Sequence, residues 1–228
     1  VWFRRDLRAH DQAALYHALT RCEQVFCAFV FDKDILDALP RADRRVEFIR
    51  ESLVELDDSL RALSPQGRGG LIVWHAVASD AIPALANALD AQAVFANHDD
   101  EPQALDRDRL VRTRLAAAGK AFHTFKDHTL LERSEVLTQT GNPYSVFTPY
   151  KNAWLKKIDV FQLKSYPVER HAHHLAARPE AHCQPVPTLQ DLGFEPTALS
   201  QLRLPTGAQG AHCLLYTSDA ADERSSVD

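Results

Sequence analysis

The sequence predicts an α/β fold with a doubly wound, five-stranded parallel sheet, followed by an extended interdomain linker. Three observations support this. Over residues 1–125, short β-branched and aromatic runs alternate with longer helical ones, as expected for βαβ units. Apolar residues make up 45% of the 228 residues, enough for a core. Six of the twelve prolines then fall within residues 165–205, where we expect a connector and no second core.

The elements follow in order along the chain. The clearest helix spans residues 41–63, where apolar residues recur at spacings of three and four and so line one face. Pro83 is expected near the first turn of the next helix and Pro102 at the first position of the one after it, because proline is tolerated there. Together with a first helix before residue 24, the chain is predicted to have four helices. Four helices alternating with five strands predict Rossmann-like layers. The five strand candidates are Val1–Phe3, Gln24–Phe31, Leu71–Trp74, Ala93–Ala96 and Ala121–Phe125.

Charge and composition limit the classes of function. The formal net charge of −5 provides no basic field for a phosphate backbone. No apolar run approaches the ~18 residues of a membrane span, so we expect neither a membrane helix nor a signal peptide. The four cysteines form no CxxC pair, which favours a reducing, cytoplasmic compartment. Because the chain has no methionine, we expect a fragment whose first strand begins before Val1.

Two acidic segments follow the second and fourth strands, where parallel sheets bind ligands. One includes Asp32 and Asp34, and the other is residues 97–102, Asn-His-Asp-Asp-Glu-Pro. Carboxylates there could accept hydrogen bonds from the N–H groups of a pterin or flavin-like ring, while Arg44 or Arg45 could meet a carbonyl or anionic group. Alternatively, Asp32, Asp34 or Asp100 caps a helix.

Three other motifs favour structural roles. Residues 4–8, Arg-Arg-Asp-Leu-Arg, contain no glycine and so form no phosphate-binding loop; we interpret them as an ion-pair network around Asp6. The histidines at 171, 173 and 174 lack further ligands, and no metal site is predicted. Residues 147–157 mix aromatics with lysines, which could stack on bases and touch phosphates, but the acidic net charge favours an amphipathic helix against a neighbouring domain.

Three segments together resemble the DNA photolyase and cryptochrome family. They are residues 1–8, Val-Trp-Phe-Arg-Arg-Asp-Leu-Arg; residues 97–102; and residues 141–150, Gly-Asn-Pro-Tyr-Ser-Val-Phe-Thr-Pro-Tyr, followed by Trp154. The resemblance covers residues 1–212. It implies an antenna-binding α/β domain over residues 1–131 and a linker over 132–212 toward a FAD-binding helical domain that the chain lacks. Residues 213–228 instead resemble translated sequencing read-through, and we expect them to be non-native and disordered.

The resemblance implies that the full-length parent is a carbon–carbon lyase, a photolyase that splits cyclobutane pyrimidine dimers in UV-damaged DNA by light-driven electron transfer from reduced FAD. The fragment would then hold no catalytic residue and would bind the antenna chromophore, a folate or a deazaflavin. Gln103 and Ala104 stand where folate-binding members carry an Asn-Glu pair, which leaves a deazaflavin, a flavin or an empty pocket open.

The resemblance also implies roles for individual residues. The antenna-binding residues would be Asp32, Arg45, Asp99 and Glu101, and interdomain or structural roles would fall to Arg5, Asp6, Arg8, Tyr150 and Trp154. We expect a cytoplasmic monomer. Two alternatives are a cryptochrome-type blue-light sensor, which would signal through a partner protein, and a stand-alone chromophore- or nucleotide-binding α/β module.

Overall fold

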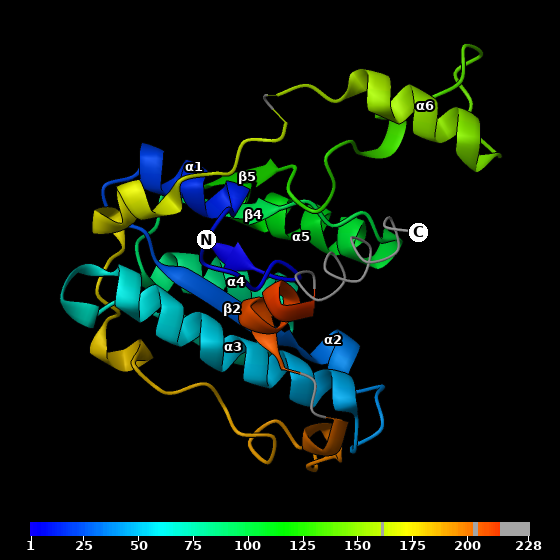
Figure 1. Ribbon diagram of the computed structural model, residues 1–228. Coiled ribbons are helices and arrows are strands. Elements are labelled where there is room, and N and C mark those ends of the chain that lie inside the picture. The colour runs from blue at the N-terminus through cyan, green and yellow to red at the C-terminus, as the bar shows by residue number, and fades with distance from the viewer. Residues whose placement is uncertain (161, 203–204, 215–228) are drawn as a thin grey trace.

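The structure is a computed structural model that describes residues 1–160, 162–202 and 205–214. Strands and helices alternate through the first 125 residues in the predicted order (Figure 1). The α/β class is therefore confirmed. The elements are β1 (Trp2–Phe3), α1 (Ala13–Arg21), β2 (Cys27–Asp32), α2 (Lys33–Leu36), α3 (Arg44–Leu63), β3 (Leu71–Ala76), α4 (Ala78–Ala88), β4 (Ala93–Asn97), α5 (Pro102–Ala117) and β5 (Ala121–Phe125). The short helix α2 was not predicted.

The strands are all parallel, but they form two hydrogen-bonded ladders and not one continuous sheet. β2 pairs with β1 and β3, and β4 pairs with β5. β1 lies beside β4 without a ladder between them in the described chain, which gives the spatial order 3-2-1-4-5. The predicted five-stranded sheet is thus present only in part, because β1 has two residues and the Arg4 guanidinium donates to the carbonyl of Asn97 at the end of β4.

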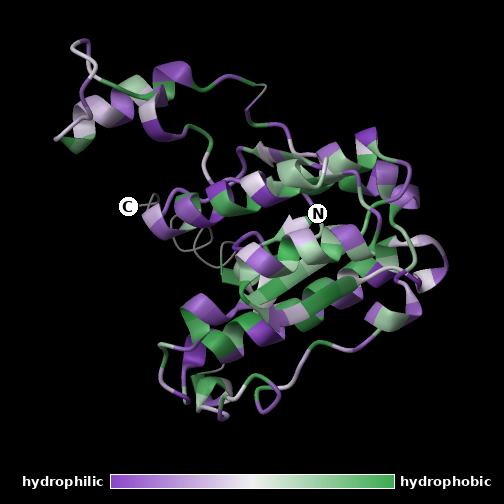
Figure 2. Cartoon of the chain, turned by 180° about the vertical axis from the view of Figure 1, so that it is seen from behind, coloured by the Kyte–Doolittle hydropathy of each residue, from purple (hydrophilic) through white to green (hydrophobic). Residues whose placement is uncertain are grey.

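Helices cover both faces of these strands, as doubly wound layers require. Phe3 and Phe29 pack on one face with α1 and α3, while Trp2 and Val30 pack on the other with α4 and α5. This alternation follows from the period of two in a strand. Figure 2 shows hydrophobic residues concentrated in the strands between the helix layers.

The apolar stripe of α3 is buried as predicted. Val46, Leu53, Leu56 and Leu60 are at most 2% exposed, and burial of each side chain contributes about 1.5–3 kcal/mol. The helix begins at Arg44 because the Asp43 carboxylate caps it, accepting from the Arg45 N–H at 2.8 Å.

Pro83 lies in the second turn of α4, close to the first turn near which the sequence predicts it. The helix begins earlier, at Ala78, because the Asp32 carboxylate accepts the Ala78 N–H at 3.1 Å. Asp32 belongs to the end of β2, and a cap so distant in sequence leaves no local signal.

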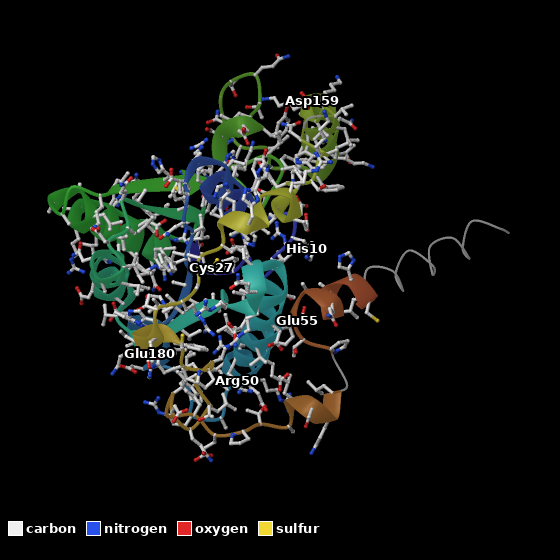
Figure 3. All side chains as sticks on the ribbon, turned by 90° about the vertical axis from the view of Figure 1, so that its left-hand side faces the viewer. His10, Cys27, Arg50, Glu55, Asp159 and Glu180 are labelled. Carbon is white, nitrogen blue, oxygen red and sulfur yellow. The ribbon has the colours of Figure 1, made fainter. Side chains whose placement is uncertain are left out.

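The linker packs along the α/β layers. Apolar residues from it join the core that α1 and α3 cover, namely Val168, Ala172, Leu175, Val186, Leu192 and Phe194. Leu175 forms a parallel bridge with Val25 before β2. Arg50 of α3 donates to the carbonyl of Pro187 at 3.2 Å, on the side of α3 visible in Figure 3. The linker is therefore part of the same packed body.

Helix α6 (Phe147–Lys157) stands apart from the layers (Figures 1 and 2). The predicted helix is confirmed, and none of its residues is buried. Figure 3 shows Asp159, which follows α6, on the same projection. Of the segment interpreted as read-through, the residues at 213 and 214 end a helical stretch at 207–214, and residues 215–228 lie outside the described residues. In the described parts of the chain, no helix is long and apolar enough to cross a membrane.

Candidate ligand site at the carboxyl ends of the strands

A cavity of about 490 Å³ opens where β1, β2 and β4 end. Its size is within the ~300–1,000 Å³ usual for small-ligand sites, and strand order reverses here, between β1 and β4. Trp2 and Phe31 contribute apolar walls. Ile35 of α2 and Leu110 of α5 also line it, and their side chains are 48% and 51% exposed. These two side chains come from helices that follow β2 and β4, on either side of β1, and suit the faces of a flat ring.

Two arginines bring the acidic segments after β2 and β4 together. Arg107 of α5 lies 3.3 Å from the Asp32 carboxylate and 3.8 Å from that of Asp99. Arg5 lies 3.2 Å from Asp99 and 2.5 Å from Glu101. The hydrogen bond that Arg5 donates to the Glu101 carboxylate raises the pKa of Arg5, which keeps this guanidinium charged. Asp32, Asp99 and Glu101 therefore share one cavity.

Asp32 both lines the cavity and caps helices, so the two interpretations of this residue are compatible. One carboxylate oxygen accepts the N–H of Asp34 at 3.3 Å and that of Ala78 at 3.1 Å, while the other faces Arg107. Asp100 caps no helix; it pairs with Arg133 at 2.6 Å. The capping alternative thus holds for Asp32 and not for Asp100.

Arg45 lies outside the residues that line the cavity. Its side chain is 70% exposed and pairs with Asp43 at 2.6 Å, which lowers the pKa of that carboxyl. The contribution of α3 to the cavity is the apolar side chain of Ile49. The cations that line the cavity are instead Arg4, Arg5 and Arg107. The first turn of α3 directs Arg45 back to its own capping residue.

Asp6 is bonded to amides and not to arginine side chains, unlike the predicted network. Its carboxylate accepts from the backbone N–H of Arg4 at 3.0 Å and from the side-chain amides of Gln12 and Asn97 at 2.5 Å each. Asn97 in turn accepts the N–H of Ala14 at 2.9 Å. This buried cluster fixes the turn after β1 against α1 and the end of β4.

The arginines of the same turn pair with acids from later in the chain. Arg4 binds Asp108 at 2.6 Å and Arg8 binds Asp127 at 2.9 Å. Burial raises the pKa of both carboxyls, and the arginines oppose that shift. Ion pairs thus do fix this turn, but the prediction that they centre on Asp6 is wrong, because the acids are Asp108 and Asp127 from later in the chain.

The remaining predicted residues lie away from the cavity. Tyr150 and Trp154 belong to α6, where Tyr150 contacts the Tyr144 ring at 6.2 Å between centroids. The rings of His173 and His174 lie 4.1 Å apart. Within the described ranges, no group of three His, Cys, Asp or Glu side chains could hold a metal ion.

Arg107 is the site residue that sequence reasoning missed. It stands between Asp106 and Asp108 on α5, and its guanidinium lies over the Trp2 ring, 5.3 Å from the centroid. The position one to two turns after Pro102, on a helix that follows an acidic loop, could have indicated it. Such a cation neutralises carboxylates that would otherwise repel one another.

Comparison with known proteins gives a consistent result. The family model described as DNA photolyase matches residues 1–179. A deoxyribodipyrimidine photo-lyase of Halobacterium salinarum is 36% identical over 207 residues, which cover 86% of this chain and 41% of that protein. Cryptochromes are also among the matches.

Solved structures agree in fold. A bacterial class III photolyase from Agrobacterium tumefaciens matches with a TM-score of 0.68 and 25% identity, over 86% of this chain and 38% of that one. An archaeal photolyase from Sulfolobus tokodaii, described with two FAD molecules and a novel light-harvesting cofactor, matches with a TM-score of 0.57 and 28% identity over 70% of this chain and 34% of that one. The chain thus spans about 40% of the length of the curated relative from Halobacterium salinarum. It belongs to the DNA photolyase family.

Proposed function

We propose that this chain is the antenna-binding part of a light-dependent DNA repair enzyme. The cavity at the carboxyl ends of β1, β2 and β4 would hold the antenna chromophore, which absorbs near-ultraviolet or blue light. The observation that carries this proposal is the combination of a cavity of about 490 Å³ with acceptor groups on Asp32, Asp99 and Glu101 and apolar side chains at its mouth. Such a site suits the N–H edge and the faces of a heteroaromatic ring.

The described residues fit a ring and not a diphosphate. Glycine-rich phosphate loops are absent from the turn after β1, where Arg4 and Arg8 are bound to Asp108 and Asp127. The guanidinium groups of Arg5 and Arg107 line the cavity and could donate to a ring carbonyl. A folate, a deazaflavin or a flavin ring all carry such groups.

The activity of the whole protein is part of the same proposal. We assign to it the splitting of cyclobutane pyrimidine dimers in UV-damaged DNA, with reduced FAD as electron donor held outside this chain. The relatives named as photo-lyases support this assignment. A cytoplasmic location is supported by the free thiols of Cys22, Cys27 and Cys183. A cryptochrome-type sensor is the second candidate, because cryptochromes also match the chain.

Reconstitution tests the antenna assignment. The full chain would be mixed with riboflavin, a deazaflavin and a folate, and binding followed by the absorption of the bound ring. We expect at least one to bind. We expect Asp99→Lys to weaken that binding about tenfold or more, because a carboxylate that accepts hydrogen bonds would be replaced by an ammonium group of the same charge as the neighbouring Arg5 and Arg107. Binding of none of the three would overturn the proposal.

Two controls separate loss of a contact from loss of the fold. Asp58→Lys reverses a charge on the exposed face of α3 and should leave binding unchanged. Asp99→Asn keeps the shape of the side chain and should have an intermediate effect. Each variant must retain the thermal unfolding transition of the parent chain. If Asp99→Lys folds and binds as the parent does, Asp99 is not in the site.

A further inference from the structure

We propose that Tyr16 and Tyr166 form an oxidative modification site, at which a light-excited flavin and dioxygen join the two phenol rings into a dityrosine. The link connects α1 covalently with the linker. Both tyrosines lie outside the residues that line the cavity at the carboxyl ends of the strands. The inference therefore goes beyond the proposed function and does not depend on it.

The two rings are in contact although they come from distant parts of the chain. The ring centroids of Tyr16, on α1, and Tyr166, in the linker, lie 5.3 Å apart, and the ring planes are inclined at 45°. Aromatic rings that pack together have centroids about 4.5–7 Å apart, so this spacing is that of direct contact. Both side chains are half-buried, which leaves part of each ring accessible to a dissolved oxidant.

The backbone around Tyr166 is held against α1. Its N–H donates to the Asp11 carboxylate at 2.8 Å, just before α1 begins. The following residues form a short 3-10 helix, Val168–His174, in which Val168 and Ala172 are buried in the same core as α1. Figure 1 shows this yellow segment running beside α1. The contact between the two rings is therefore fixed by the fold.

A neutral imidazole lies beside the pair and can take up a phenolic proton. The His17 ring packs against both phenols, with centroid distances of 5.4 Å to Tyr16 and 5.7 Å to Tyr166. Burial and the nearby charge of Arg21 lower the pKa of His17, so the imidazole is uncharged at about pH 7. An uncharged imidazole is a base, which suits the removal of a proton from an oxidised phenol.

Negative charge near Tyr166 favours loss of an electron from its ring. Burial raises the pKa of Tyr166, and the carboxylates of Asp127 and Asp11 raise it further. The phenol is thus protonated before oxidation and must lose its proton as the electron leaves. Carboxylates stabilise the positive charge that develops on the ring during this step.

The oxidation conserves atoms and electrons. Each tyrosine gives up one electron and its phenolic proton, and the excited flavin takes up the two electrons with two protons. The two ring radicals form one carbon–carbon bond between the carbons next to their oxygens, and the hydrogen on each of these carbons moves to the oxygen. Dioxygen reoxidises the flavin and leaves as hydrogen peroxide. The net change transfers two hydrogen atoms from the protein to dioxygen.

A second pair of tyrosines provides an internal comparison. Tyr144 and Tyr150 lie before and on α6, which stands apart from the layers, and their ring centroids are 6.2 Å apart. Trypsin separates Tyr16 and Tyr166 into the peptides 9–21 and 165–170, whereas Tyr144 and Tyr150 stay together in the peptide 134–151. Mass spectrometry of a digest therefore distinguishes the two links.

Irradiation of the full chain tests the inference. The chain would be exposed to blue light with riboflavin in air and then digested with trypsin. We expect peptides 9–21 and 165–170 to be joined, with the loss of two hydrogens. The yield should be at least about tenfold higher than for the chain unfolded in urea, because the fold holds the rings together. In a mixture of isotope-labelled and unlabelled chains, both joined peptides should come from the same chain.

Variants that keep the ring and remove the hydroxyl identify the two partners. Tyr16→Phe and Tyr166→Phe should each abolish the joined peptides. Tyr144→Phe is the matched control and should leave their yield unchanged. Free tyrosine irradiated alongside should form dityrosine, which verifies the oxidant.

Three results would overturn the inference. The first is that peptides 9–21 and 165–170 are not joined, including the case in which only Tyr144 and Tyr150 are linked. The second is an equal yield from the folded and the unfolded chain, and the third is a link between labelled and unlabelled chains. The ligand site at the carboxyl ends of the strands stands in all three cases, because no step of the test uses it.

Discussion

The two ends of the strands differ in chemistry. At the carboxyl ends, a cavity of about 490 Å³ is lined by eight charged side chains, most of them paired. At the amino ends, a cavity of about 70 Å³ is lined mainly by apolar residues such as Val25, Ile82 and Leu85, and among the described residues no charged side chain lines it. Burial there raises the pKa of the Cys27 thiol to about 11. The amino ends therefore serve packing, and the carboxyl ends can hold a ligand.

The largest effect is expected where a charge enters the packed layers. Leu53 is fully buried on α3, so Leu53→Asp should lower the free energy of unfolding by at least about 4 kcal/mol and unfold much of the chain. Leu110 lines the cavity at the carboxyl ends and is 51% exposed. Leu110→Asp should therefore change stability by less than about 0.5 kcal/mol.

Urea denaturation followed by circular dichroism measures both variants. Equal destabilisation by the two substitutions would show that the carboxyl ends are packed as tightly as the core. That result would contradict the difference in packing between the core and the carboxyl ends of the strands, on which the proposed ligand site rests.

A smaller effect is expected at Asp32, where the cavity and the fold share one side chain. Asp32→Ala leaves the N–H groups of Asp34 and Ala78 without their acceptor and should cost about 1–3 kcal/mol. Asp34→Ala removes an exposed carboxylate of the same cavity and should cost less than about 0.5 kcal/mol. Thermal unfolding compares the two, and an equally small loss for Asp32→Ala would show that its bonds to the helices are unimportant.

The smallest effect is expected at Arg45, which the structure places away from the cavity. The Arg45 guanidinium lowers the pKa of Asp43 in the folded state. The resulting stabilisation is present above the unfolded value of about 3.9 and is lost as the pH falls through the lower folded value. Arg45→Ala should thus reduce stability slightly at pH 7 and make it fall less steeply below about pH 4.

Chromophore binding provides the second readout for Arg45→Ala. We expect affinity within about twofold of the parent chain, because the side chain is exposed and paired outside the cavity. A tenfold loss of affinity would show that Arg45 contributes to ligand binding after all.

Much of the fold could be predicted from local patterns. The stripe of α3 and the alternation of strands and helices depend on periodicity, which a sequence displays directly. The start of α4 and the bond between Asp6 and Asn97 could not be predicted, because each joins residues more than 40 positions apart, Asp32 with Ala78 in the first case and Asp6 with Asn97 in the second.

The lining of the candidate cavity could be predicted to a similar degree. Placing Asp32, Asp99 and Glu101 together required only the rule that parallel strands end at one edge. Arg107 lines the cavity and Arg45 does not, because the direction of a long side chain depends on its nearest carboxylate. For Arg45 that carboxylate is the helix cap at Asp43, and for Arg107 it is Asp32 across the cavity.

Hydrogen–deuterium exchange of the full chain, with and without the tightest-binding ring compound, tests the central claim most directly. If the ligand occupies the carboxyl ends, added protection should appear in residues 32–36 and 97–107, and residues 82–94 should be unchanged. Protection confined to residues 82–94 would place the ligand at the amino ends of the strands and contradict the account.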